Sequence, residues 1–214
     1  MSLVIAGLDE VGIGALAGPY IAAVAVFRPK DLILLPPGVR DSKKTSEAQR
    51  GMLFAPIIKA AWDVGIGYAW PWEIDRMGAA EALQLTYRRA LGELRVTYDQ
   101  LVIDGNVGVR NFKTLFHPSS VKVEPKADVN YQQVSAASII AKWARDEMMI
   151  SYGRRFPAYS WNENKGYGTA AHEKAIKEVG LLIDDTDFSR YIHRKQYCKK
   201  FLFEQRGVNG GEVR

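Results

Sequence analysis

Four acidic residues stand at positions where a carboxylate can do chemistry. Asp9 and Glu10 directly follow a short apolar run near the start of the chain. Asp104 follows a second apolar run, and Asp128 lies just before the longest helix that the sequence predicts. Burying a carboxylate at the edge of a core is costly unless the group is paired or binds a metal. Because the pattern occurs at two apolar runs, it indicates one shared metal centre.

Oxygen ligands of this kind favour Mg²⁺ or Mn²⁺ over zinc. Two such ions can activate a water molecule and stabilise the leaving oxygen of a phosphodiester. Zinc is disfavoured because His117, His172 and His193 are far apart in the sequence, and Cys198 is the single cysteine. We therefore predict a divalent-metal-dependent nuclease in which the four acids are both metal ligands and catalytic groups.

Each acid also has a simpler explanation when it is taken alone. Asp9 or Asp104 could be an ordinary turn-forming or capping residue. Asp128 could be a charge that favours the N-terminal end of the helix that follows it. These explanations leave the adjacent pair Asp9-Glu10 unexplained, and the convergence of the four acids in space is an assumption at this point.

The elements that must position these acids are a mixture of strands and helices. Apolar spacing predicts five strands, over residues 3–8, 21–27, 64–70, 101–103 and 121–123. Helices are predicted over residues 46–61, 72–96 with a break near Gly78, 130–154 and 169–179, and a loop over 29–37. The class is therefore α/β or α+β with a mixed sheet. Acids at strand ends suit such a fold, because ligand sites in open sheets commonly lie there.

The basic residues are concentrated in the second half of the chain. Residues 1–104 hold 11 Lys and Arg against 12 Asp and Glu, whereas residues 105–214 hold 18 against 12. A basic half favours a polyanionic partner, since neutralising phosphates releases counterions. A basic surface that serves only solubility explains the same charge, so a nucleic-acid partner is one of two options at this stage.

The composition is that of an ordinary globular protein with one core. The chain has 214 residues, of which 47% are apolar and 25% are charged. No apolar run approaches the roughly twenty residues that cross a membrane, and residues 1–8 lack the features of a secretory signal. We expect a cytoplasmic monomer with one catalytic domain over residues 1–204, which includes a helical C-terminal region, and a flexible tail over 205–214.

Five segments, taken in order, resemble the motifs of the type 2 ribonucleases H, the ribonuclease HII family. They cover residues 7–19, 41–44, 101–105, 126–128 with 135–142 and 145–146, and 164–169 with His172. Each segment alone is a weak signal, but five in the family's order are highly specific. The resemblance extends over residues 4–197.

The resemblance implies a ribonuclease H-like fold, in which helices flank a five-stranded mixed sheet. It implies hydrolysis of the RNA strand of RNA–DNA hybrids, and incision on the 5′ side of ribonucleotides embedded in duplex DNA. The products would carry 3′-hydroxyl and 5′-phosphate ends, and two Mg²⁺ or Mn²⁺ ions would act. The residues that match the family's four catalytic, metal-binding positions are Asp9, Glu10, Asp104 and Asp128.

The resemblance also implies residues that bind the substrate. Tyr167 matches a tyrosine that packs on the sugar at the RNA–DNA junction, although an ordinary core aromatic is the simpler reading of its type. Lys43 and Lys142 match phosphate contacts, with solvated surface charges as the alternative. The loop that matches the family's sensor of the ribose 2′-hydroxyl consists of Gly12, Ile13 and Gly14.

This loop is where the sequence departs from the family. The family usually has Gly-Arg-Gly, and Ile13 has neither the charge nor the donors of the arginine. We therefore expect that hybrid cleavage is retained and that preference for a single embedded ribonucleotide is weakened. The segment also resembles ribonuclease HIII, whose hybrid-specific activity is an alternative. That family carries an extra N-terminal domain, so the length of this chain favours the HII type.

Two functions of other kinds stay open beside the metal nuclease. A non-catalytic nucleic-acid-binding homologue would have kept the fold and lost the chemistry, and Ile13 is the feature that supports it. All four acids being present argues against it, because acids held against phosphate do not help a pure binder. Another nuclease or a transposase on the same fold would also use carboxylates and metals, but the motifs after residue 41 do not suggest one.

Overall fold

A five-stranded mixed sheet forms the centre of the computed structural model, which describes residues 3–39, 45–105 and 120–201. Its strands are β1 (Ile5–Val11), β2 (Tyr20–Phe27), β3 (Asp63–Ala69), β4 (Gln100–Asp104) and β5 (Ser120–Glu124). Their order is β3-β2-β1-β4-β5, with β1 antiparallel to β2 and parallel to β4. The predicted five-stranded mixed sheet is therefore confirmed.

Helices and short 3-10 turns surround this sheet. They are η1 (Pro29–Leu34), α1 (Glu47–Ala60), α2 (Pro71–Met77), α3 (Ala79–Gly92), α4 (Ala127–Asn130), α5 (Gln132–Arg155), η4 (Pro157–Tyr159), α6 (Trp161–Asn164), α7 (Ala170–Val179) and η5 (Phe188–Arg190). Two expected boundaries are confirmed: Ser46 caps α1 through the backbone N–H of Gln49, and Gly78 separates α2 from α3. The predicted loop over residues 29–37 was wrong for its first part, because residues 29–34 form η1.

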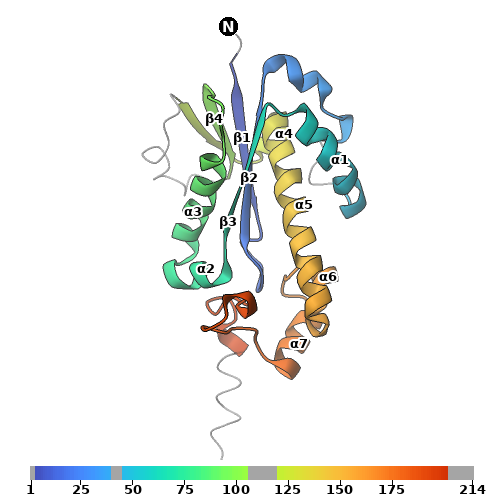
Figure 1. Cartoon of the computed structure of the whole chain (residues 1–214), viewed down its shortest axis with the longest axis vertical. Helices are drawn as coiled ribbons and strands as arrows, with labels where there is room; N and C mark the ends of the chain where they lie inside the picture. The colour runs from blue at the N-terminus through green and yellow to red at the C-terminus, as the bar shows by residue number, and fades with distance from the viewer. Residues whose placement is uncertain (1–2, 40–44, 106–119, 202–214) are drawn as a thin grey trace, which may run out of the picture.

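Helix α5 covers one face of the sheet and α3 covers the other, as Figure 1 shows. All eight residues of β2 are buried between them, and each buried Val, Ile or Phe side chain contributes about 1.5–3 kcal/mol. Small residues let both helices approach closely. A Cβ on Gly7 would lie 2.3 Å from the backbone nitrogen of Val134, and one on Gly67 would lie 2.0 Å from the carbonyl oxygen of Thr86.

The region after α5 forms a second, aromatic cluster around the buried Trp161. Figure 1 shows this region, in orange and red, gathered at the end of the sheet where α2 lies. It reaches back to the start of the chain through an isolated bridge between Ala17 and His193. The C-terminal segment therefore contributes to the same end of the molecule as the turn that follows β1.

Strand β1 is longer than the sequence predicted. It runs through Asp9 and Glu10 to Val11, because β2 continues to pair with it as far as Ile21. The two acids thus lie among the last three residues of a paired strand, not after its end. The expected tail over residues 205–214 and the motif over 41–44 lie outside the described residues. Within residues 3–39, 45–105 and 120–201, no helix is both long and apolar enough to cross a membrane.

Candidate active site

Asp9 and Asp104 lie side by side on neighbouring parallel strands. The register pairs Leu8 with Ile103, so the next residue on each strand is the acid. Side chains alternate between the two faces of a strand, and both aspartates fall on the face that α5 covers. Asp104 is fixed there by the backbone N–H of Ala127, which donates to its Oδ1 at 2.9 Å. The parallel pairing of β1 and β4 therefore builds the first half of the site.

The carboxylate of Asp9 is buried among other acids. Its Oδ1 accepts the backbone N–H of Glu10 at 2.9 Å, and Ser138 on α5 also hydrogen-bonds its side chain. Burial, followed by the charges of Glu10 and Asp104, raises the pKa of Asp9 to about 8, against the opposing effect of these hydrogen bonds. A bound cation would reverse this shift, because an opposite charge favours the ionised form.

Glu10 points to the opposite face of the sheet from Asp9. Its Oε2 accepts a hydrogen bond from the hydroxyl of Tyr87, which lies on α3 and is almost fully buried. Burial and the charge of Glu10 hold the pKa of Tyr87 well above its ordinary value, so the hydroxyl remains a donor. Helix α3 therefore fixes Glu10, while α5 covers Asp9.

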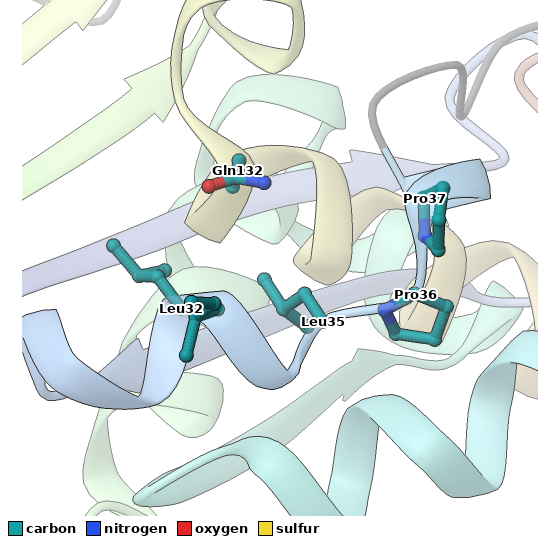
Figure 2. Close-up of a pocket in the computed structure, with 6 residues that line it drawn as sticks. Leu32, Leu35, Pro36, Pro37 and Gln132 are labelled. Atoms are coloured by element: carbon teal, nitrogen blue, oxygen red, sulfur yellow. The ribbon is translucent and has the colours of Figure 1, made fainter.

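Asp128 lies in the short helix α4 and is 4% exposed. It borders a polar pocket together with Leu32, Val129, Asn130, Gln132 and Gln133. Figure 2 shows the adjoining, more apolar pocket, whose walls are Leu32, Ile33, Leu35, Pro36, Pro37 and Gln132. Leu32 of η1 and Gln132 at the start of α5 line both pockets, and Asp128 borders the polar one.

The chemistry of these donors fits a hard divalent cation. All of them are carboxylate oxygens, the ligands that Mg²⁺ and Mn²⁺ prefer, and the pKa of Asp9 is raised first by its burial and then by the charges of Glu10 and Asp104. In the part of the chain that the structure describes, no three His, Cys, Asp or Glu side chains are spaced to hold one metal ion. The structure thus brings Asp9 and Asp104 together on neighbouring strands, and the convergence of all four acids on one metal centre stays a prediction.

The turn after β1 contains Gly12, Ile13 and Gly14. Gly12 is buried with a φ of +91°, and a Cβ there would lie 2.3 Å from Nε of Arg145. Gly14 is exposed, with no neighbouring atom within 4 Å of where its Cβ would be. The side chain of Ile13 packs against an apolar cluster that includes Tyr20. The turn therefore presents its backbone at Gly14, while Ile13 contributes to packing.

Arg145 on α5 holds this turn against the C-terminal region. It is fully buried, and it donates to the carbonyl oxygens of Ala17 at 2.9 Å, Pro19 at 3.2 Å and Lys165 at 2.9 Å. Hydrogen bonds to a charged donor are stronger than neutral ones. One guanidinium group therefore fixes the distance between two loops that are far apart in the sequence.

Arg194 supports the same turn from the C-terminal segment. It is also fully buried, and it donates to the carbonyl oxygens of Gly12 at 2.7 Å, Ala15 at 2.9 Å and Gly18 at 2.7 Å. Burial, together with the charge of Arg145, lowers the pKa of Arg194 to about 9. The group therefore keeps its charge at neutral pH, and the carbonyls of the turn point inward toward it.

Tyr167 stands beside this turn. The carbonyl oxygen of Gly166 accepts the backbone N–H groups of Leu16 at 2.9 Å and Ala17 at 3.1 Å. The ring of Tyr167 is partly buried, and the guanidinium carbon of Arg145 lies 5.1 Å from its centroid. The structure thus brings the predicted sugar-binding tyrosine next to the predicted 2′-hydroxyl sensor.

Lys142 also lies near Tyr167, with its Nζ 5.8 Å from the ring centroid. The same Nζ bonds Oδ1 of the buried Asp146 at 2.7 Å, and Arg50 bonds the other oxygen at 3.0 Å. Lys142 therefore combines a partly exposed cation with a fixed position, as a phosphate contact requires. Lys43, the other predicted phosphate contact, lies outside the described residues.

Sequence reasoning did not identify the two buried arginines as part of the site. One signal was present for Arg145, which continues the four-residue spacing of Ala137 and Ala141, and all three residues are buried in α5. A charged residue on such a face needs partners. Arg194 gave no comparable signal, because its partners are backbone carbonyls near the opposite end of the chain.

Comparison with known proteins bears on the family and the fold of this chain. A family model described as Ribonuclease HII matches residues 6–200. The chain is 39% identical over 209 residues to a ribonuclease HII of Trichodesmium erythraeum, covering 96% of this chain and 92% of that protein. It is 42% identical over 177 residues to that of Syntrophotalea carbinolica, covering 82% and 80%. The structure resembles ribonuclease H2 from Pyrococcus horikoshii with a TM-score of 0.80 and 29% identity, covering 95% of this chain and 99% of that chain.

Proposed function

The chain belongs to the ribonuclease HII family of metal-dependent endoribonucleases, and we propose that it hydrolyses the RNA strand of RNA–DNA hybrids at Asp9 and Asp104. The observation that carries this proposal is the pairing of β1 with β4, which sets the two aspartates side by side. Glu10 adjoins them, and Asp128 follows on α4. These four acids are the proposed catalytic and metal-binding residues.

Each acid has a role that follows from its surroundings. Asp9 and Asp104 would hold divalent cations between β1 and α5, with Ser138 and the N–H of Ala127 orienting their oxygens. Tyr87 would keep Glu10 in place from α3. Two ions of Mg²⁺ or Mn²⁺, when bound, would supply the activation of water and the stabilisation of the leaving oxygen. The proposed products carry 3′-hydroxyl and 5′-phosphate ends.

The substrate would lie across the turn after β1 and the ring of Tyr167. The exposed backbone at Gly14 would approach the ribose, and Tyr167 would pack on the sugar that follows. Lys142 would contact a phosphate from its position beside Asp146. These contacts also support incision on the 5′ side of a ribonucleotide embedded in duplex DNA.

We further propose that the single-ribonucleotide preference is weak in this protein. The side chain of Ile13 packs on the cluster around Tyr20 and has no charge to offer a phosphate. A long hybrid makes many other backbone contacts, so the loss of one matters less there. A substrate with a single ribonucleotide depends more strongly on the turn itself.

The experiment is a cleavage assay with two substrates, a long RNA–DNA hybrid and a DNA duplex that contains one ribonucleotide. With Mg²⁺ and with Mn²⁺ we expect cutting of the hybrid that equals or exceeds cutting at the single ribonucleotide. Strong preference for the single ribonucleotide would overturn the proposed role of Ile13. Binding of both duplexes with no cleavage under either metal would instead indicate a non-catalytic homologue.

A variant pair tests the site itself. Asp104→Asn should abolish cleavage and leave duplex binding intact, because the amide keeps the shape of the side chain but not its charge. Asp99→Asn is the matched control, since Asp99 is an exposed acid just before the same strand. Normal cleavage by the Asp104→Asn variant would contradict the assignment of the acids.

A further inference from the structure

Two buried histidines form a hydrogen-bonded chain that ends at the backbone of Tyr167. His172 on α7 and His193 in the C-terminal segment are both 0% exposed, and their Nε2 atoms are 3.3 Å apart. Trp161, also fully buried, donates from Nε1 to Nε2 of His172 at 2.9 Å. Nδ1 of His172 lies 2.9 Å from the carbonyl oxygen of Tyr167. Because buried polar groups are almost always hydrogen-bonded, each ring nitrogen of the two histidines must either donate or accept a hydrogen bond.

The direction of the chain is determined by its first donor. The backbone N–H of Leu182 donates to Nδ1 of His193 at 2.9 Å. An N–H can only donate, so Nδ1 of His193 carries no proton. Neutral His193 therefore holds its proton on Nε2, and it donates that proton to Nε2 of His172.

The same reasoning fixes His172. Its Nε2 accepts from both Trp161 and His193, so it carries no proton. Neutral His172 therefore holds its proton on Nδ1 and donates it to the carbonyl oxygen of Tyr167. Every ring nitrogen has one role, and the chain runs from Leu182 to Tyr167 in one direction.

The surroundings keep both histidines neutral. Burial, together with the neighbouring His172, lowers the pKa of His193 to about 3. Burial also lowers the pKa of His172, against opposing effects of its bond to Tyr167 and of the nearby Glu173. The ring of Tyr159 packs edge-on against both imidazoles. A second proton on either ring would face a donor, so the geometry also excludes it.

We propose that His172 and His193 are positioning residues for Tyr167. They hold its backbone carbonyl, and thereby keep its ring in the position where it packs on the substrate sugar. The proposal rests on the proposed function of Tyr167. One peptide before this carbonyl, Gly166 is bonded to the turn after β1. The residue is therefore held from both sides, by the turn through Gly166 and by the histidine chain through its own carbonyl.

Two substitutions of His172 separate the two ends of its ring. His172→Asn keeps an N–H donor near the position of Nδ1, which can still bond the carbonyl of Tyr167. His172→Gln keeps an acceptor near the position of Nε2, which can still receive Trp161 and His193, but it loses the donor to Tyr167. We expect His172→Gln to lower kcat/KM on the hybrid by roughly tenfold to a hundredfold relative to the wild type. His172→Asn should retain most of the wild-type kcat/KM. Equal losses in the two variants would overturn the proposal.

Each substitution is then combined with Tyr167→Ala. If the histidines act through Tyr167, His172→Gln has little further effect on kcat/KM once the ring is gone. A merely structural role would lower the activity by the same factor in both backgrounds, and that result would overturn the proposal. Wild-type protein that fails to cut hybrids would contradict the proposed function. Intact wild-type activity with a harmless His172→Gln substitution would contradict only the role of the histidines.

A measurement on the wild-type protein covers the case in which the variants do not fold. Nitrogen NMR of the imidazoles at pH 7 should show His172 with its proton on Nδ1 and His193 with its proton on Nε2. Addition of an RNA–DNA hybrid in the presence of a metal chelator should shift the Nδ1 resonance of His172. The substrate would contact Tyr167, whose carbonyl oxygen accepts the hydrogen bond from this nitrogen. The opposite tautomers, or no shift on binding, would overturn the proposal.

Discussion

Tyr87 on α3 donates a hydrogen bond from its hydroxyl to the carboxylate of Glu10 on β1. The two residues meet on the face of the sheet opposite to Asp9, so adjacent acids in the sequence are fixed by different helices. A ligand that is oriented by a second residue usually depends on that residue for its affinity for metal. Tyr87 is therefore expected to matter for the metal requirement of the enzyme.

Tyr87→Phe should lower cleavage by about tenfold to a hundredfold and raise the Mg²⁺ concentration needed for half-maximal rate. The substitution removes one hydroxyl and keeps the ring in the core, so the fold should persist. The measurement is hybrid cleavage as a function of Mg²⁺ concentration. Tyr98→Phe is the control, because Tyr98 packs against the same core cluster. An unchanged Mg²⁺ dependence would show that Glu10 does not need this anchor.

Asp9→Asn should abolish cleavage and at the same time stabilise the metal-free protein. The pKa of Asp9 is raised to about 8 in the folded protein, from an ordinary value of 3.8. Its contribution to stability is thus present below about pH 3.8 and is lost as the pH rises through 8. At pH 8.5 without divalent ions, the neutral amide should increase the free energy of unfolding by on the order of 1–3 kcal/mol.

Urea unfolding with and without Mg²⁺ measures this effect. Mg²⁺ should stabilise the wild-type protein by binding the folded state and should stabilise the Asp9→Asn variant less. A variant that is less stable than the wild type in chelator at pH 8.5 would contradict the unfavourable burial of the Asp9 carboxylate beside Glu10 and Asp104.

The stability that depends on His193 should be lost in acid. Its pKa is depressed from 6.5 to about 3, so the unfolded chain binds this proton first. The stability is therefore present above pH 6.5 and is lost as the pH falls toward 3, by at most about 1.4 kcal/mol per pH unit. His193→Asn keeps an acceptor for the N–H of Leu182 but cannot be protonated. The difference in free energy of unfolding between wild type and this variant should shrink from pH 7 to pH 4.5, and a constant difference would contradict the buried, neutral state of His193.

Arg194→Met should destabilise the protein by about 3 kcal/mol or more and abolish cleavage. The carbonyl oxygens of Gly12, Ala15 and Gly18 would lose their shared donor in a buried place, and each unpaired group costs about 1–3 kcal/mol. The control is Arg190→Met, because Arg190 is exposed and should change stability by no more than about 0.5 kcal/mol. Chemical unfolding of the two variants gives the comparison. Similar small changes in both would show that solvent replaces Arg194.

The sheet was predictable because the signals of its strands are local. An apolar run that ends in an acid is visible in five or six residues around Asp9 or Asp104, and the break at Gly78 is a single residue. The true end of β1 was not predictable in this way. Its last residues are strand only because β2 pairs with them as far as Ile21, and pairing between strands is not encoded in the spacing of one of them.

The parts of the site that the sequence did not reveal depend on contacts across the chain. Arg145 and Arg194 bond backbone carbonyl oxygens. Every residue offers the same carbonyl whatever its side chain, so the sequence does not mark these partners. His172 and His193 are 21 positions apart, and their distance in sequence served only to disfavour zinc. A chain of neutral imidazoles leaves no charge pattern or spacing that a sequence could display.

The bonds between Arg194 and the turn after β1 also impose an order on the making of the enzyme. A ribosome synthesises the turn first, yet the partner of the Gly12 carbonyl is added 182 residues later. Until Arg194 is added, the turn after β1 lacks the buried cation to which its carbonyl oxygens bond. A chain that ended before Arg194 would therefore carry the acids of β1 but would lack the cation that holds the carbonyl oxygens of this turn.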